Sequence, residues 1–130
     1  MDNRPVGVFD SGVGGISVLR ELVKLMPEEN YVYFGDSKNA PYGSKSANEV
    51  RKLSLDIAGY FKSINVKAIV VACNTATSAA VAEMRKLYED IAVVGIEPAV
   101  KPAVRYKKGS RVLVLATPVT LREEKFRKLA

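Results

Sequence analysis

Short runs of apolar, often β-branched residues alternate along this chain with segments in which apolar residues recur at helical spacing. The apolar runs cover residues 6–9, 31–34, 68–72, 92–96 and 112–116. Two helical stripes lie between these runs, formed by Ile16, Leu19, Leu22, Val23 and Met26 and by Val50, Leu53, Ile57, Phe61 and Ile64. Strands separated by helices in this way are typical of a parallel sheet with right-handed crossovers. We therefore predict an α/β protein with a doubly wound parallel sheet, in three αβα layers.

Turn and capping residues support these boundaries. Pro27 should stop the first helix, and Ser46 with Glu49 three residues later fits a capping box. Gly109 and Ser110 break the chain before the fifth apolar run. The chain has 130 residues, the size of one ordinary domain. Residues 120–130 begin a helical pattern that has no glycine or proline terminator, so we expect an incomplete unit.

Cysteine and histidine usage narrows the chemistry. A single cysteine cannot form an internal disulfide, which favours a reducing cytoplasm. The absence of histidine excludes Ser-His-Asp triads, Cys-His pairs and nearly all types of zinc site. The apolar runs are also far shorter than the ~20 residues of a membrane helix. We expect no membrane span.

The net charge of +6 leaves a nucleic-acid or other anionic partner open as one alternative. The basic residues are spread along the chain, and no basic run is interleaved with aromatic residues. The densest stretches, residues 105–111 and 122–128, are more typical of solvated surfaces.

Polar and reactive residues follow the ends of the predicted strands, at residues 10–15, 35–46, 73–75, 97–99 and 117–120. In open parallel sheets, ligands bind beyond the carboxyl ends of the strands. If the first and third strands are neighbours, as in the flavodoxin-like order 2-1-3, Asp10 and Cys73 face one cleft. Asp10 has a second interpretation, as an acid that caps a turn or helix.

A glycine loop after the first strand offers a competing function. Gly12, Gly14 and Ser17 approximate the G-x-G-x-x-G fingerprint, and Asp36 falls where a ribose-binding acid would lie. A non-catalytic module that binds a dinucleotide or phosphate is therefore one alternative. The other is that these glycines only permit a tight turn. No G-x-x-x-x-G-K-[ST] phosphate loop is present.

Cys73 also has two interpretations. A lone cysteine is commonly a small buried hydrophobe. However, Cys73 lies at a strand end and just before a helix predicted to begin near Thr75, where free N–H groups and the helix dipole favour a thiolate. The long loop of residues 36–46 is either a surface turn or a ligand-binding segment.

Four motifs together are similar to one known family. They are VFDSGVGGISVLREL at residues 8–22, YFGDSKNAPYGSKS at 33–46, ACNTATSAA at 72–80 and VVGIEPAVKPA at 93–103. They closely resemble the glutamate racemases of the cofactor-independent aspartate/glutamate racemase superfamily. The resemblance implies interconversion of L- and D-glutamate for peptidoglycan in the cytoplasm, without cofactor or metal. It leaves open a homodimer of the full-length form.

The resemblance also implies roles for individual residues. Cys73 matches the first of two catalytic thiols that flank the α-carbon of the substrate, and Asp10 matches the acid that assists it. The motif positions implied to bind or surround glutamate are Ser11, Pro41, Tyr42, Gly43, Asn74, Thr75, Thr117 and Thr120.

The chain departs from the family pattern at one decisive point. Family members are about twice this length, and their second half carries the opposing cysteine in a Cys-Thr-His motif. This chain has neither a second cysteine nor a histidine. The resemblance implies an N-terminal α/β domain at residues 1–98 and the beginning of a second, similar domain at residues 99–130. We expect a truncated racemase that does not racemise alone.

Overall fold

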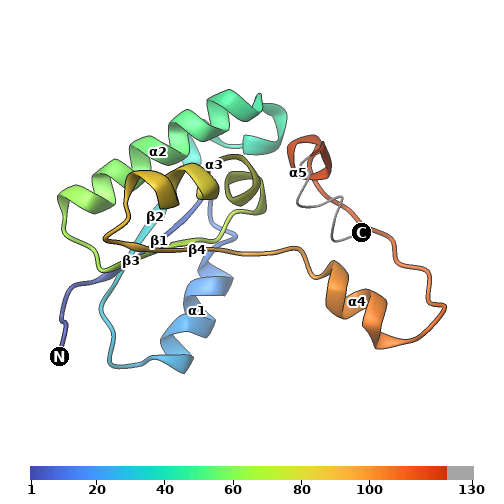
Figure 1. The fold of residues 1–130 in the computed structure, drawn as a ribbon, viewed down its shortest axis with the longest axis horizontal. Coiled ribbons are helices and arrows are strands. Elements are labelled where there is room, and N and C mark those ends of the chain that lie inside the picture. The colour runs from blue at the N-terminus through green and yellow to red at the C-terminus, as the bar shows by residue number, and fades with distance from the viewer. Residues whose placement is uncertain (123–130) are drawn as a thin grey trace.

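A computed structural model of the chain describes residues 1–122 (Figure 1). Its centre is a sheet of four parallel strands in the order β2-β1-β3-β4. The strands are β1 (Val6–Asp10), β2 (Tyr31–Gly35), β3 (Ala68–Val71) and β4 (Ala92–Gly95). Phe9 of β1 lies opposite Val71 of β3. The predicted neighbourhood of the first and third strands is confirmed, so both strands end at the same edge.

The helices follow the strands as the sequence predicts. They are α1 (Ile16–Leu25), α2 (Ala47–Ser63), α3 (Asn74–Leu87), α4 (Val100–Tyr106) and α5 (Pro118–Arg122), with short 3₁₀ turns η1 (Ser37–Asn39) and η2 (Tyr42–Ser44). The α1 helix ends before Pro27. The capping box of α2 is confirmed, because Glu49 N–H donates to Ser46 Oγ at 3.2 Å and Ser46 N–H donates to Glu49 Oε2 at 2.8 Å. Within residues 1–122, no helix is both long and apolar enough to cross a bilayer.

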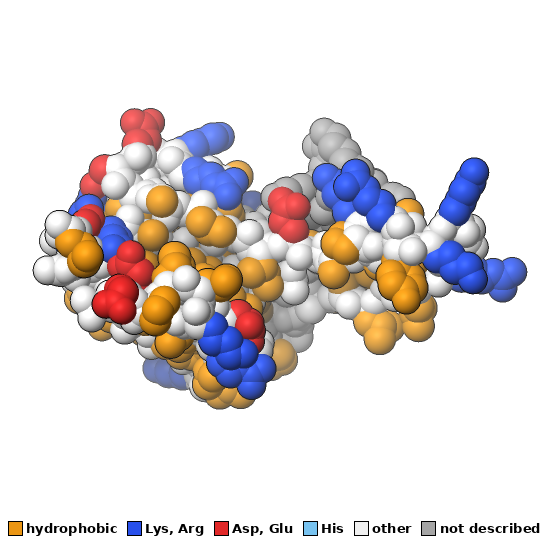
Figure 2. Space-filling model, turned by 90° about the horizontal axis from the view of Figure 1, so that it is seen from below, with side chains coloured by type: hydrophobic (Ala, Val, Ile, Leu, Met, Phe, Trp, Pro, Cys, Tyr) orange, Lys and Arg blue, Asp and Glu red, His pale blue; other side chains and the backbone are white. Residues whose placement is uncertain are grey.

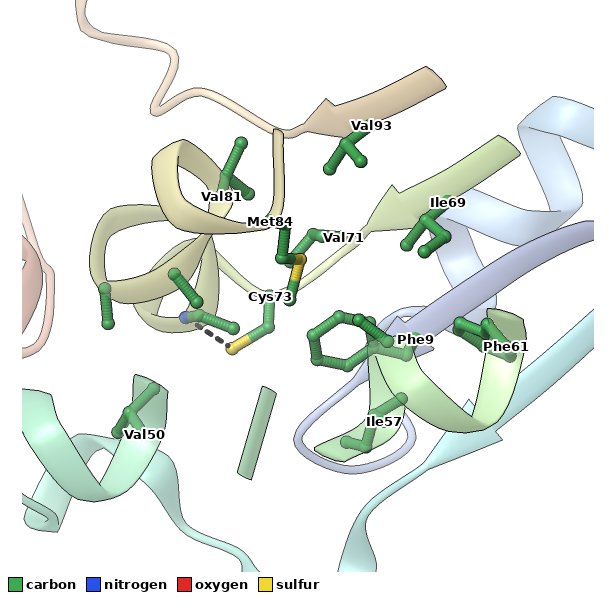
Figure 3. Packing of buried hydrophobic residues seen from close by; sticks show 14 of the residues in the cluster. Phe9, Val50, Ile57, Phe61, Ile69, Val71, Cys73, Val81, Met84 and Val93 are labelled. Atoms are coloured by element: carbon green, nitrogen blue, oxygen red, sulfur yellow. Dashed lines mark hydrogen bonds between the residues drawn. The ribbon is translucent and has the colours of Figure 1, made fainter. Parts of the chain in front are cut away.

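Alternate residues of the strands serve the two faces of the sheet. On one face, α2 and α3 cover a large core (Figures 1 and 3) that includes Phe9, Phe61, Ile69, Val71 and Met84. On the other face, α1 packs on a smaller cluster built on Val6, Val8, Val70 and Ala72. The sheet is therefore an inner layer between helices, as predicted.

The α1 face is covered less completely than its opposite. No residue of α1 is buried, and Val94 of β4 is 53% exposed. Figure 2 shows hydrophobic side chains spread over the surface seen from below, the side of the sheet on which α1 lies. Val13, Ile16 and Leu25 are among the exposed hydrophobic residues. One short helix is thus the main cover of this face.

Residues 97–117, here called the arm, leave β4, form α4 and return to α5 beside α3 (Figure 1). The predicted fifth strand at residues 112–116 was wrong, because none of the described strands pairs with it. Leu113 and Leu115 are 85% and 87% exposed. An apolar run becomes a strand only where a neighbour supplies hydrogen bonds for its backbone, and this run has none in the sheet.

Basic side chains gather at the far end of the arm (Figure 2). All of residues 105–111 are exposed, which confirms the prediction of a solvated segment there. The second basic stretch, residues 122–128, lies outside the described residues except for Arg122. The helical pattern predicted over residues 120–130 is likewise described only as far as Arg122, within α5.

Gly7 makes room for an aromatic ring of the core. A Cβ atom added to Gly7 would lie 2.9 Å from ring carbons of Phe61, which is fully buried. The absence of a side chain on β1 therefore allows the aromatic ring from α2 to lie directly on the sheet.

Substitution of Gly7 by alanine should lower the free energy of unfolding by about 1–3 kcal/mol, because the Phe61 ring must move from its packed position. Urea denaturation measures this. Gly59→Ala is the matched control, since Gly59 lies within α2 and its added Cβ would meet only Tyr88 Oη at 3.6 Å. That change should stabilise the helix by about 0.5–1 kcal/mol. Equal effects of the two substitutions would contradict the packing argument.

Candidate active site

A cavity of about 740 Å³ opens at the carboxyl edge of the sheet. Its walls come from the ends of β1 and β3, the first turn of α3 and the arm. Six of the predicted site residues line it, namely Asp10, Cys73, Asn74, Thr75, Thr117 and Thr120. The sheet order and the return of the arm to α5 beside α3 thus bring together residues that are up to 110 positions apart in the chain (Asp10 to Thr120).

Asp10 ends β1, and its carboxyl group is nearly buried. Its Oδ2 atom accepts hydrogen bonds from Gly12 N–H at 3.1 Å and Gly15 N–H at 3.2 Å. These N–H groups belong to the turn that precedes α1, so Asp10 caps this turn, one of the roles predicted for it. The same residue also lines the cavity. The two interpretations of Asp10 are therefore compatible.

Cys73 is the N-cap residue of α3. Its Sγ accepts from Ala76 N–H at 3.4 Å, the contact drawn as a dashed line in Figure 3. Its thiol also lies 3.7 Å from Ser11 Oγ, in donor geometry toward that hydroxyl. The side chain is 6% exposed and belongs to the large core, yet it lines the cavity. A helix start stabilises negative charge, so this position suits a thiolate as well as a packed thiol.

Three threonine hydroxyls connect α3 to the end of the arm. Thr75 Oγ1 lies 3.0 Å from Thr117 Oγ1, which lies 3.1 Å from Thr120 Oγ1. Thr120 is only 1% exposed, and its backbone N–H also donates to Thr117 Oγ1 at 3.4 Å. Thr117 is therefore the middle of a hydrogen-bonded chain at the cavity wall.

The loop between β2 and α2 lies beside the cavity. Tyr42 is 1% exposed, and its hydroxyl donates to Asp36 Oδ2 at 2.6 Å. Burial raises the pKa of Tyr42, and the hydrogen bond and negative charge of Asp36 raise it further. Pro41 and Tyr42 are not among the residues that line the cavity. Gly43 lies against its wall, because an added Cβ would be 2.7 Å from Thr117 Cγ2.

This geometry does not favour the dinucleotide alternative. The Asp36 carboxylate is buried and accepts a hydrogen bond from the Tyr42 hydroxyl. The amide of Asn39 donates to both of its oxygens, at 2.9 Å to Oδ1 and 3.1 Å to Oδ2. A ribose would have to displace those partners. The N–H groups of Gly12 and Gly15, where a pyrophosphate would bind, already donate to Asp10. Among residues 1–122, no group of three His, Cys, Asp or Glu side chains could hold a metal ion.

The sequence reasoning missed several residues at this edge. Tyr33 Oη donates to Gly12 O at 2.8 Å, and Asn39 holds Asp36. The alternation of β2 could have placed Tyr33 on the α1 face, although not its hydrogen-bond partner. Ile96, Pro98 and Val100 line the cavity, but only the path of the arm reveals this.

Comparisons with known proteins identify relatives that match nearly the whole chain, including the residues of this site. Residues 6–130 match the family model Asp/Glu/Hydantoin racemase. A glutamate racemase from Clostridium acetobutylicum is 58% identical over 127 residues, which are 98% of this chain and 50% of that protein. The chain spans about half the length of the curated relatives it matches.

Solved structures agree in sequence and in fold. Glutamate racemase from Thermus thermophilus, in complex with beta-chloro-D-alanine, is 43% identical with a TM-score of 0.77, covering 98% of this chain and 48% of its own. Glutamate racemase from Francisella tularensis, in complex with D-glutamate, is 34% identical with a TM-score of 0.83 and the same coverages of 98% and 48%. The chain is thus similar in fold to about half of each of these enzymes.

Substitution of Tyr42 by phenylalanine should make stability less sensitive to alkaline pH. The folded chain holds the pKa of this phenol above the value of about 10 expected when unfolded. Stability linked to Tyr42 is therefore present below about pH 10 and is lost as the pH rises above it, because the unfolded chain releases the proton first.

Urea denaturation from pH 8 to pH 11.5 measures this effect. Tyr42→Phe should lower the free energy of unfolding by about 1–3 kcal/mol at neutral pH, since Asp36 loses a buried donor. Its stability should then fall less steeply above about pH 10. Tyr106→Phe is the matched control, because Tyr106 is 90% exposed. It should change neither the free energy of unfolding at neutral pH nor its decline at alkaline pH. An unaltered alkaline slope in the Tyr42 variant would contradict the assignment.

Proposed function

This chain belongs to the Asp/Glu/hydantoin racemase family, and from that premise we propose that it supplies one half of a two-base active site for glutamate racemisation. The observation that carries the proposal is that Asp10 and Cys73 line the same cavity, with Cys73 at the start of α3. Glutamate racemases at 53–58% identity over nearly the whole chain support the choice of substrate.

Inversion at the α-carbon without a cofactor requires a base on one face and an acid on the other. Cys73 thiolate would take the α-proton onto Sγ, leaving the electron pair on the α-carbon and the adjoining carboxylate. A thiol on the opposite face would then return a proton to that carbon. With L- and D-glutamate exchanged, the two groups exchange roles.

On this proposal the second thiol comes from outside this set of residues, because Cys73 is their only cysteine. We infer that these 130 residues alone bind glutamate weakly and do not racemise it. On this proposal, residues 1–98 form one α/β domain, and residues 99–130 begin a second domain that brings the other half of the site. D-glutamate for peptidoglycan would be the product, made in the cytoplasm. A homodimer of the full-length form stays open.

Polar groups near Cys73 supply the binding part of the proposal. Ser11, Asn74 and Thr75 present hydroxyl and amide donors suited to the substrate carboxylates and ammonium, and Thr117 adds a hydroxyl from the arm. Donors aimed at a carboxylate stabilise the charge that develops beside the α-carbon. Asp10 would assist Cys73. Tyr42, Gly43 and Thr120 would add further contacts to the substrate, and Pro41 would shape the loop that carries Tyr42 and Gly43.

Exchange of the α-proton of glutamate in deuterated water tests the catalytic assignment. A protein that joins these residues to a second thiol-bearing half should exchange the proton and racemise both enantiomers. Cys73→Ala should reduce exchange by about 10²- to 10⁴-fold, the range for loss of a positioned acid or base. Ser110→Ala, in an exposed turn, should leave the rate unchanged. Full exchange by the Cys73 variant would refute the proposed base.

A further inference from the structure

The loop that follows β1 is attached to β2 at a single carbonyl group. Tyr33 Oη donates to Gly12 O at 2.8 Å. The same carbonyl lies tightly against the end of β2, because a Cβ added to Gly35 would be only 2.6 Å from Gly12 O. Tyr33 and Gly35 therefore hold Gly12 from one strand, by a hydrogen bond and by close approach.

Gly12 is in turn a partner of Asp10. Its N–H donates to Asp10 Oδ2, and Gly15 N–H donates to the same atom. Gly15 also lies close to the phenol, since its added Cβ would be 3.0 Å from Tyr33 Oη and 2.6 Å from Asp10 Cβ. The phenol thus donates to the carbonyl of Gly12 and lies close to Gly15, while the carboxylate accepts from the N–H groups of both glycines.

We propose that Tyr33 is a positioning residue that fixes the Asp10 carboxylate at the cavity by holding the carbonyl of Gly12. The catalytic meaning of this role rests on the proposed function, whereas the role in loop geometry does not. Burial raises the pKa of Tyr33 and the negative charge of Asp10 raises it further, against a smaller lowering by the Gly15 backbone, so the phenol keeps the proton that it donates.

Tyr31 offers a matched comparison on the same strand. Both tyrosines pack in the smaller cluster on the α1 face. Tyr31 Oη donates to Leu22 O at 3.1 Å and Met26 O at 3.0 Å, at the far end of α1. Tyr31→Phe and Tyr33→Phe therefore remove the same atom from the same face, but only the second removes a bond to the Asp10 loop.

Amide hydrogen exchange in this chain, followed by NMR, tests the geometry. Tyr33→Phe should speed exchange at Gly12 and Gly15 by roughly fivefold, about the value of one hydrogen bond. The Ala72 amide, bound to Phe9 O at 2.8 Å within the sheet, should not change. Tyr31→Phe should leave both glycines protected. Unaltered glycine exchange in Tyr33→Phe, or equal acceleration in Tyr31→Phe, would overturn the proposal.

Two further measurements separate this proposal from its premise. Gly35→Ala keeps the phenol but pushes Gly12 O away, so it should also speed exchange at Gly12 and Gly15. This variant tests the same geometry if Tyr33→Phe does not fold. In the racemising protein, Tyr33→Phe should lower kcat with little change in KM, and Tyr31→Phe should alter neither. An unchanged kcat despite faster glycine exchange would overturn the positioning role. Absence of racemisation in the unsubstituted protein would instead refute the proposed function, and the exchange data would still decide the loop geometry.

Discussion

Parallel pairing of β1 with β3 is the constraint on which the candidate site depends. Because Phe9 lies opposite Val71, the chain leaves both strands at one level, with Asp10 on one and Cys73 just beyond the other. Each strand then leads toward a helix: N–H groups of the turn before α1 bind the Asp10 carboxylate, and an N–H group in the first turn of α3 binds the Cys73 sulfur. A shift in this register would move Asp10 and Cys73 away from each other, although each would keep its local N–H partners.

Much of this arrangement could be predicted because it follows from local pattern. Apolar runs predicted five strands, four of which are present, and helical stripes predicted α1, α2 and the class of sheet, while Ser46 with Glu49 predicted the start of α2. Asp10 and Cys73 could be predicted as site residues because they end strands that share an edge. These inferences need only residue periodicity and the general topology of parallel sheets.

The remaining features are set by contacts between distant segments. Residues 112–116 have the composition of a strand, but pairing requires a neighbouring edge, which composition does not encode. Asp36 occupies the position of a ribose-binding acid, yet Tyr42 and Asn39 engage it from its own loop. The sequence alone predicts Tyr33 as a packing residue, and only the structure shows that its hydroxyl donates a hydrogen bond to Gly12 O. In each case a partner in space, rather than the residue type, decides the role.

The threonine chain gives the arm a mechanical property. The arm follows the end of β4 at Gly95, and its other end is held at Thr117, which bonds to Thr75 in the first turn of α3 and lies against Gly43. A segment that is attached at both ends cannot move independently of its attachment points. Any force that displaces the arm is therefore transmitted to the helix turn that holds Cys73 and to the Tyr42 loop, so motion of the arm and the shape of the cavity are mechanically linked.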